Sequence, residues 1–206
     1  MPIILILSLM FVLWIRYQTK KSTQTIESAS EEFWRKEQEA NFIRNQPLDS
    51  INFIEVPLHQ LPIIESTDKE LQKLQDTLLA ISKEKIANLS QYTNTELKLT
   101  YGTGNFTFLS QCDTNYITLL QTIQQLANLH QENDNIPAAI AYYEYAVECK
   151  SENSNTYVNL ALLYSHTNNE AKVEDLKNLI LLSEYKNKDT ILKKVERSLL
   201  EDLLSN

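Results

Sequence analysis

The chain has little of the two residues that most often interrupt helices. Among its 206 residues there are only two glycines and five prolines. Leucine, isoleucine, glutamate, glutamine, lysine and asparagine are abundant instead, and this composition favours helices. The sequence therefore predicts an all-α fold.

Cysteine and histidine are also scarce. Cys112 and Cys149 are far apart in the chain, in a spacing that is typical of neither metal-binding nor redox motifs. We expect two free, buried thiols in a reducing compartment, with a single disulfide as the alternative. His59, His130 and His166 share no metal-ligand spacing with one another or with the cysteines. No metal and no cofactor is predicted.

Excess positive charge is absent too. The formal net charge is −8, which gives no electrostatic reason to bind nucleic acid. Gly102 and Gly104, the only glycines, match neither a dinucleotide fingerprint nor a P-loop, so we interpret them as a turn. Cys112 with His130 could act as nucleophile and base, but no strand-turn-helix context supports this pair, and Asp113 is explained as a helix cap. We therefore expect neither catalysis nor a small-molecule substrate.

One apolar run is present, residues 3–15, in which only Ser8 is polar. At 1.5 Å per residue it extends about 20 Å, less than the roughly 30 Å of a bilayer core. It lacks the basic start and the nearby cleavage site of a signal peptide. Trp14 and Tyr17 are suited to the membrane interface. We predict an N-terminal single transmembrane helix over residues 1–17.

Three basic residues follow the apolar run, namely Arg16, Lys20 and Lys21. Their side chains can extend toward the headgroups and so help a short segment to span. By the positive-inside rule the N-terminus lies outside and the C-terminal domain lies in the cytoplasm. We expect a single-pass protein of the cell membrane that contacts the lipid bilayer through residues 3–15. A secreted protein with a retained leader is the alternative.

Residues 18–65 are predicted to form a juxtamembrane tether, a short helix and an extended linker. Ser28, with a glutamate three residues later, has the pattern of a capping box and predicts a helix start. Pro47 is expected to end this helix. Between Ile51 and Leu61 apolar alternation is combined with proline, so we expect an extended segment that packs against the helical body or is bound by a partner.

The helical domain is predicted to occupy residues 66–206. Thr67 and Glu70 have the pattern of a second capping box, and apolar residues recur at helical spacing through about Ser90. A later helix is expected to begin at Asp113.

One pattern occurs twice between residues 120 and 164. Four positions recur at one constant offset: Ile123, Leu126, Ala127 and His130 correspond to Tyr157, Leu160, Ala161 and Tyr164. Between the two copies lie Ala139, Tyr143 and Ala146, at spacings of four and three. A fixed period of about 34 residues, with small residues beside large apolar ones, is typical of stacked helix pairs.

In these residues the chain resembles the tetratricopeptide repeat (TPR) family, with Asn133 to Asn135 at that family's turn. The resemblance implies antiparallel helix pairs at residues 120–153 and 154–187. It implies a role in helix packing for Leu126, Ala127, Ala139, Tyr143, Ala146, Leu160, Ala161 and Tyr164. A C-terminal capping helix is expected from Lys188 to Leu204, since one side is apolar and the other charged.

In TPR proteins the first helices of successive repeats line a concave groove that binds peptides or partner helices. Asn128 and Asn159 match two asparagines with which some members bind a peptide carboxylate, but Gln124 stands where those members have a basic residue. The implied groove is therefore lined mainly by amides: Gln121, Gln124, Asn128, Gln131, Asn155, Asn159 and His166. Neutral amides can donate to and accept from a peptide backbone. A solvated helix face is the alternative.

The sequence and the resemblance together predict a membrane-anchored, non-catalytic adaptor or scaffold that binds a protein or peptide partner through this groove. A structural subunit of a membrane or envelope assembly, with repeats used for self-association, is the alternative.

Overall fold

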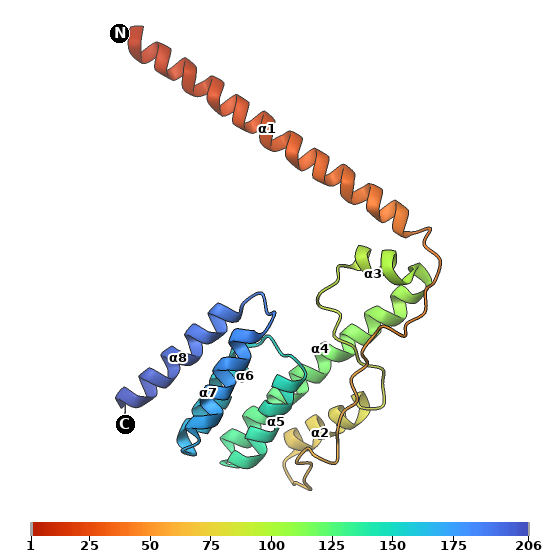
Figure 1. Cartoon of the computed structure of the whole chain (residues 1–206), viewed down its shortest axis with the longest axis vertical. Coiled ribbons are helices and arrows are strands. Elements are labelled where there is room, and N and C mark those ends of the chain that lie inside the picture. Colours follow the sequence, from red (N-terminus) through yellow and green to blue (C-terminus); the bar gives the residue numbers. More distant parts are fainter. Residues whose placement is uncertain (1, 206) are drawn as a thin grey trace. The chain divides into compact units, whose positions relative to one another are not determined.

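The computed structural model describes residues 2–205, and of residues 2–6, 8, 9, 21–26 and 205 it describes the backbone alone. The chain is all-α as predicted; within residues 2–205 no strand forms, and Phe53 and Ala87 make an isolated antiparallel bridge. The helices (Figure 1) are α1 (Pro2–Ala40), α2 (Lys69–Ile81), α3 (Asn94–Tyr101), α4 (Thr103–Glu132), α5 (Ile136–Glu148), α6 (Ser154–His166), α7 (Glu170–Leu182) and α8 (Lys188–Ser205).

The chain divides into two compact units. The first comprises Met1–Ser50 and Leu89–Ser110, and the second comprises Ile51–Asn88 and Gln111–Asn206. Helix α4 therefore contributes its first residues to one unit and the rest to the other. The two units are described separately below.

In the first unit, α1 is one continuous helix. It passes without a break through residues 18–26, where a polar tether was predicted, and through Ser28, where a new helix start was predicted. The capping pattern at Ser28 is not used, because neither glycine nor proline interrupts residues 3–46. Near its end Glu37 accepts a hydrogen bond from Thr95 of α3 at 2.7 Å and forms an ion pair with Lys98.

The predicted transmembrane helix over residues 1–17 is not supported. In the described part of the chain, no helix combines the length and the apolar character that a membrane crossing requires. Helix α1 is long, but its apolar part ends at Ile15 and the rest is mostly polar. The side chains of residues 3–6, 8 and 9, which belong to the same prediction, lie outside the described residues.

The junction between α3 and α4 uses both glycines of the chain. Gly102 has a φ of +86°, and a Cβ atom there would lie 2.6 Å from the Cα of Asn45. The side-chain oxygen of Asn45 accepts a hydrogen bond from the backbone N–H of Gly104 at 2.9 Å. Asn45 therefore caps the N-terminus of α4. A phosphate-binding loop at this place would need backbone N–H groups that no other part of the chain binds.

Two helix boundaries differ from the predictions. Helix α4 begins at Thr103, so Asp113 lies inside the helix and does not cap it. The cap of α4 comes from Asn45, which is distant in sequence, so no local signal marked this start. Helix α2 is capped by Asp68, whose side chain accepts from Glu70 N at 2.8 Å, and it ends at Ile81 instead of continuing to about Ser90.

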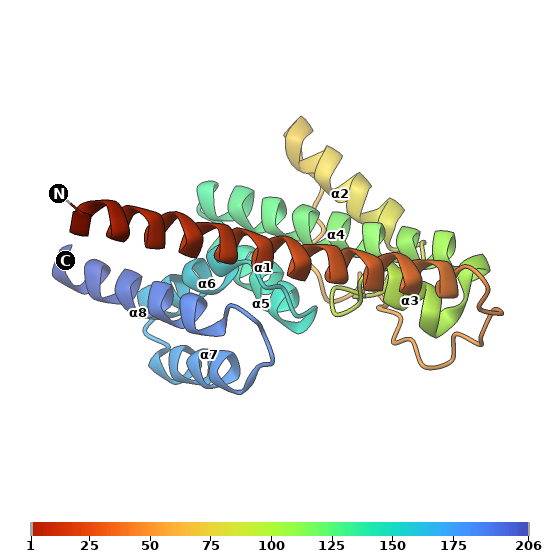
Figure 2. The same cartoon turned by 90° about the horizontal axis from the view of Figure 1, so that it is seen from above.

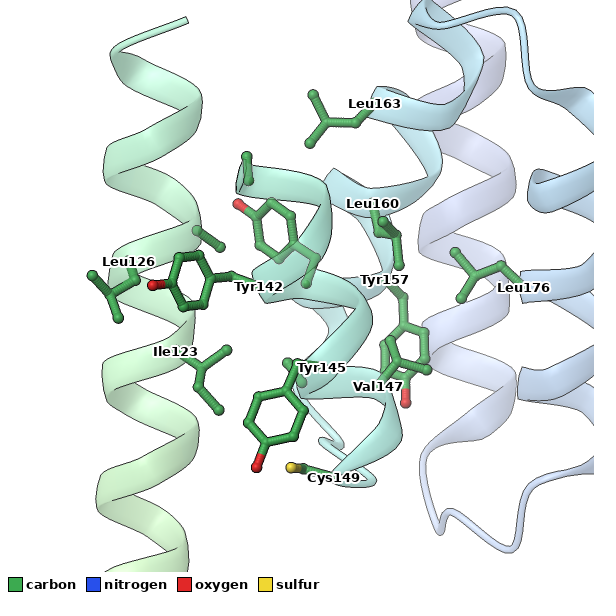
Figure 3. Close-up of a cluster of buried hydrophobic side chains, with 14 of the residues drawn as sticks. Ile123, Leu126, Tyr142, Tyr145, Val147, Cys149, Tyr157, Leu160, Leu163 and Leu176 are labelled. Carbon is green, nitrogen blue, oxygen red and sulfur yellow. The ribbon is translucent and has the colours of Figure 1, made fainter. Parts of the chain in front are cut away.

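In the second unit, α5 to α8 run side by side (Figures 1 and 2), with α6 in contact with α5, α7 and α8. A single hydrophobic core connects them. Leu126 of α4, Tyr142 of α5, and Tyr157 and Leu160 of α6 belong to this core (Figure 3). These four residues and Ile191 of α8 are at most 1% exposed. Burial of this kind supplies most of the favourable free energy of folding.

Residues 51–66 include the predicted extended segment between Ile51 and Leu61, and of its two predicted roles the structure shows packing against the helices of the second unit, to which it belongs. Ile54 N donates to Ile86 O at 2.8 Å, and Tyr142 Oη donates to Pro62 O at 3.2 Å. The apolar side chains of this segment that contact the core are Ile54, Val56, Leu58 and Leu61. An apolar segment without helix or strand is stabilised here by hydrogen bonds to its neighbours and by burial.

The turns that follow α4 and α6 have the same geometry. Asp134 and Asn168, which are separated by the same offset as the repeated positions, have φ values of 58° and 56°. The next residue of each turn, Asn135 or Asn169, donates its backbone N–H to the carbonyl five residues earlier at 2.8 Å. The side chains of these two asparagines cap α5 and α7. The turn after α5 has the same backbone geometry, with Lys150 left-handed and Ser151 N donating to Ala146 O at 3.0 Å. What recurs with the period is therefore the asparagine directly after the left-handed residue, which caps the next helix.

Lys150 also has a left-handed backbone, with a φ of 61° at the end of α5. Glycine adopts this conformation without the steric strain that a Cβ atom causes. We expect Lys150→Gly to raise the free energy of unfolding of the second unit by about 1 kcal/mol in urea titrations. Lys150→Ala keeps the Cβ atom and should give no gain, so equal gains in both variants would contradict this explanation.

Candidate partner-binding site

Four of the seven predicted groove residues meet around the hydroxyl of Tyr143. Tyr143 Oη lies 2.7 Å from Asn128 Oδ1 and 3.1 Å from Gln131 Oε1, to either of which it can donate, and it accepts from Asn159 Nδ2 at 2.8 Å. Gln124 Nε2 donates to Asn128 Oδ1 at 2.9 Å, and Thr156 Oγ1 donates to Gln124 Oε1 at 2.6 Å. We define the Tyr143 cluster as Gln124, Asn128, Gln131, Tyr143, Thr156 and Asn159.

The Tyr143 cluster joins three helices. Its members come from α4, α5 and α6, and Tyr143 itself is fully buried. Burial raises the pKa of Tyr143, so its hydroxyl stays protonated and can donate. The amide side chains hydrogen-bond to Tyr143, to Thr156 and to one another. These contacts connect α4, α5 and α6 and fix the positions of the three helices relative to one another.

The other three predicted groove residues lie outside this cluster. Gln121 of α4 and Asn155 of α6 are exposed. His166, near the end of α6, is exposed as well, and its Nε2 lies 3.0 Å from both carboxylate oxygens of Asp202 on α8. The structure therefore brings four predicted residues together and leaves Gln121 and Asn155 open to solvent.

All residues with an expected packing role are buried. None of Leu126, Ala127, Ala139, Tyr143, Ala146, Leu160, Ala161 and Tyr164 is more than 6% exposed. The four alanines among them are at most 1% exposed. Small buried side chains allow neighbouring helix backbones to approach closely.

Two tyrosines that fix the turn after α5 were not anticipated from the sequence. Tyr116 Oη donates to Cys149 O at 2.9 Å, and Tyr157 Oη donates to Ser151 O at 2.7 Å. Burial raises the pKa of both tyrosines, so both hydroxyls remain donors. The signal that could have indicated them is the count of ten tyrosines, since a buried tyrosine needs a hydrogen-bond partner.

The two cysteines are free and buried, as predicted. Burial raises the pKa of the Cys112 thiol, and it raises that of Cys149 to about 11. Both therefore stay protonated near neutral pH, whereas a nucleophilic cysteine needs a thiolate. In the part of the chain that the structure describes, no three His, Cys, Asp or Glu side chains are grouped as metal ligands would be.

His130 is a core residue, 2% exposed, and its ring stacks on Tyr142 with centroids 5.5 Å apart. Its Nε2 has no hydrogen-bond partner among the described residues, and burial lowers its pKa below 6.5. The unfolded chain therefore binds a proton at a higher pH than the folded chain does, and stability falls as the pH drops through 6.5 toward the folded pKa.

We expect the melting temperature of the chain to fall between pH 7 and pH 5, by differential scanning fluorimetry, and His130→Phe to remove most of this fall. Phenylalanine retains the stacking on Tyr142 without a titrating group. His59→Ala, at an exposed histidine, is the matched control and should keep the fall. An unchanged pH dependence in His130→Phe would contradict the role of His130.

Removing the Tyr143 hydroxyl tests the Tyr143 cluster. We expect Tyr143→Phe to lower the free energy of unfolding by about 2 kcal/mol, because the amides lose their common partner. Tyr145 is the control, since among the described residues its buried hydroxyl has only the weakly bonding thiol of Cys149 beside it. Tyr145→Phe should leave stability unchanged or raise it in the same urea titrations. Equal losses in the two variants would show that the cluster adds no stability.

Comparison with protein-family models, with curated proteins and with solved structures gives no match to this chain. No relative therefore supplies a site or a partner that could be carried over to it. The resemblance to the TPR family stays a hypothesis that depends on the residues named above.

Proposed function

We propose that this chain is a non-catalytic adaptor or scaffold built of TPR-like helix pairs, which binds a protein or peptide partner on the face formed by α4, α6 and α8. The observation that carries the proposal is the pair of turns at Asp134 and Asn168, one sequence period apart, each followed directly by an asparagine that caps the next helix. Stacked helix pairs with a fixed period align their first helices into one extended surface.

Helix α8 supports this arrangement. Ile191 and Val195 stand one further period after Tyr157 and Ala161, and all four are fully buried. In the proposed solenoid, α8 therefore takes the place of the first helix of a further pair. On the same face, Gln121 and Asn155 are exposed amides that can donate to and accept from a partner's backbone.

The proposal includes attachment to a membrane through residues 3–15. Among the described side chains, Leu7 and those from Met10 to Ile15 are all apolar and are 42–65% exposed. Transfer of such side chains from water into lipid lowers the free energy. Arg16 and Lys20 follow directly and suit the anionic headgroups of the cytoplasmic leaflet. The helical units would then face the cytoplasm.

Site-specific photo-crosslinking tests this function. We expect a photo-reactive amino acid at Gln121 or Asn155 of the full chain, in membranes of cells that produce it, to give one discrete adduct with another protein. The same probe at Glu174 or Asn178, exposed on α7, is the control and should give none. No adduct from the first two positions, or equal yields from all four, would contradict the proposal.

Self-association in a structural assembly is the second candidate function, and exposed leucines near the C-terminus favour it. Leu182 of α7 and Leu200, Leu203 and Leu204 of α8 are 58–85% exposed. Light scattering of the full chain separates the two candidates. A monomer supports the adaptor, whereas a stable oligomer, with crosslinks only between copies of the chain, supports the structural subunit.

A further inference from the structure

A hollow of about 250 Å³ lies between α5 and α7, with α6 beneath it. It is lined by Glu144, Val147, Glu148, Leu160, Tyr164, Lys172, Asp175, Leu176 and Leu179. Its floor is apolar: Val147, Leu160 and Leu176 are buried, and Leu179 is 42% exposed. In Figure 3 the side chain of Leu176 points toward α6, the helix that carries Leu160. None of the predicted groove residues lines it.

Carboxylates surround this apolar floor. Glu144 is neutralised, because Lys172 Nζ lies 2.7 Å from its Oε1 and Tyr164 Oη donates to the same oxygen at 2.6 Å. Lys172 is fixed further by its position over the Tyr164 ring, 5.1 Å from the centroid. Glu148 and Asp175 are exposed and pair with no group in the described part of the chain. Two uncompensated negative charges thus flank an apolar hollow.

We propose that this hollow docks a basic segment of a partner protein. One large aliphatic or aromatic side chain of the partner enters the hollow and contacts Leu160, Leu176 and Leu179. A lysine or arginine on either side of that residue pairs with Glu148 and Asp175. The hollow is smaller than the roughly 300–1,000 Å³ of sites for drug-sized molecules, which suits a single side chain.

Charge selects the partner. A positive segment meets Glu148 and Asp175 locally, and the chain's net charge of −8 attracts it from a distance. An acidic or neutral segment with the same apolar residue gains neither contribution. The docking surface goes beyond the adaptor face, because α5 and α7 supply its walls whereas α4, α6 and α8 form that face.

A panel of short capped peptides tests the proposal with the full chain. Each peptide carries Leu, Ile, Met, Phe or Trp between lysines and arginines, and a matched panel has glutamate in place of the basic residues. We expect at least one basic peptide to bind in fluorescence anisotropy, more weakly as salt increases, and no acidic peptide to bind. Failure of every basic peptide, or equal binding of both panels, overturns the proposal.

Two pairs of variants locate the site. Leu179→Ser is expected to weaken binding about tenfold, whereas Leu182→Ser, on the same helix but outside the hollow, should not change it. Likewise the double variant Glu148→Lys and Asp175→Lys should weaken binding about tenfold and reduce its salt dependence. Glu184→Lys with Glu196→Lys changes the net charge equally at other exposed positions and is the control.

If each control weakens binding as much as its partner variant, the peptides bind elsewhere and the proposal is wrong. Circular dichroism of every variant separates loss of binding from loss of fold. Crosslinks at Gln121 and Asn155 are measured independently, so failure of this docking surface and failure of the adaptor function can be told apart.

Discussion

Replacing Ala127 with leucine is expected to lower the free energy of unfolding of the second unit by about 3 kcal/mol. Ala127 is fully buried on α4, and the equivalent position on α6 is Ala161, which is also fully buried. A larger side chain here pushes α4 away from the helices packed against it and disturbs the Tyr143 cluster. Urea titration followed by far-UV circular dichroism measures the loss.

Ala171→Leu is the matched control. Ala171 lies on α7 and is exposed, so the same substitution there should change stability by no more than about 0.5 kcal/mol. If Ala127→Leu is no more destabilising than Ala171→Leu, the helices do not pack closely at Ala127. The explanation that alanines recur to allow close helix packing would then be wrong as well.

In the first unit, Gly102→Ala is expected to destabilise the α3–α4 junction by about 3 kcal/mol. The backbone of Gly102 has a φ of +86°, and an added Cβ would lie 2.6 Å from Asn45 Cα and 2.8 Å from Arg44 O. Both neighbours are backbone atoms, so they cannot rotate away. Amide hydrogen exchange of residues 94–110 measures the change, since faster exchange reports local opening.

Gly104→Ala is the informative comparison. The three atoms nearest to an added Cβ at Gly104 all belong to the side-chain amide of Asn45, which can rotate at the loss of its hydrogen bond to Gly104 N. We therefore expect a smaller loss than for Gly102→Ala. Equal exchange rates in the two variants would contradict a close backbone approach at Gly102.

The all-α fold and the helices after residue 135 follow from local signals in the sequence. Asn135, Pro137 and Asn169 mark helix starts at short range, and the observed starts of α6 and α8 agree with the predictions. The start of α4 could not be predicted in this way, because its cap is Asn45, far away in the chain. At Ser28 a local cap signal is present, but it does not start a helix, because no residue there interrupts α1.

For the candidate site, periodicity places Gln124, Asn128 and Asn159 on the first helices of the proposed pairs. It does not predict that these amides bond to Tyr143 and Thr156, because the relative rotation and offset of neighbouring helices depend on packing. The hollow between α5 and α7 could not be predicted either, because three helices line it and their relative placement depends on packing.

Native-state hydrogen exchange of the full chain tests most directly whether α4 to α8 share one core. A shared core predicts that amides near Leu126 on α4, Tyr143 on α5, Leu160 on α6, Ile180 on α7 and Ile191 on α8 open with one common free energy in mild denaturant. If amides of α7 and α8 open with a much smaller free energy than those of α4 and α5, the helix pairs fold independently. That result would contradict the nesting of the pairs, on which the proposed adaptor face depends.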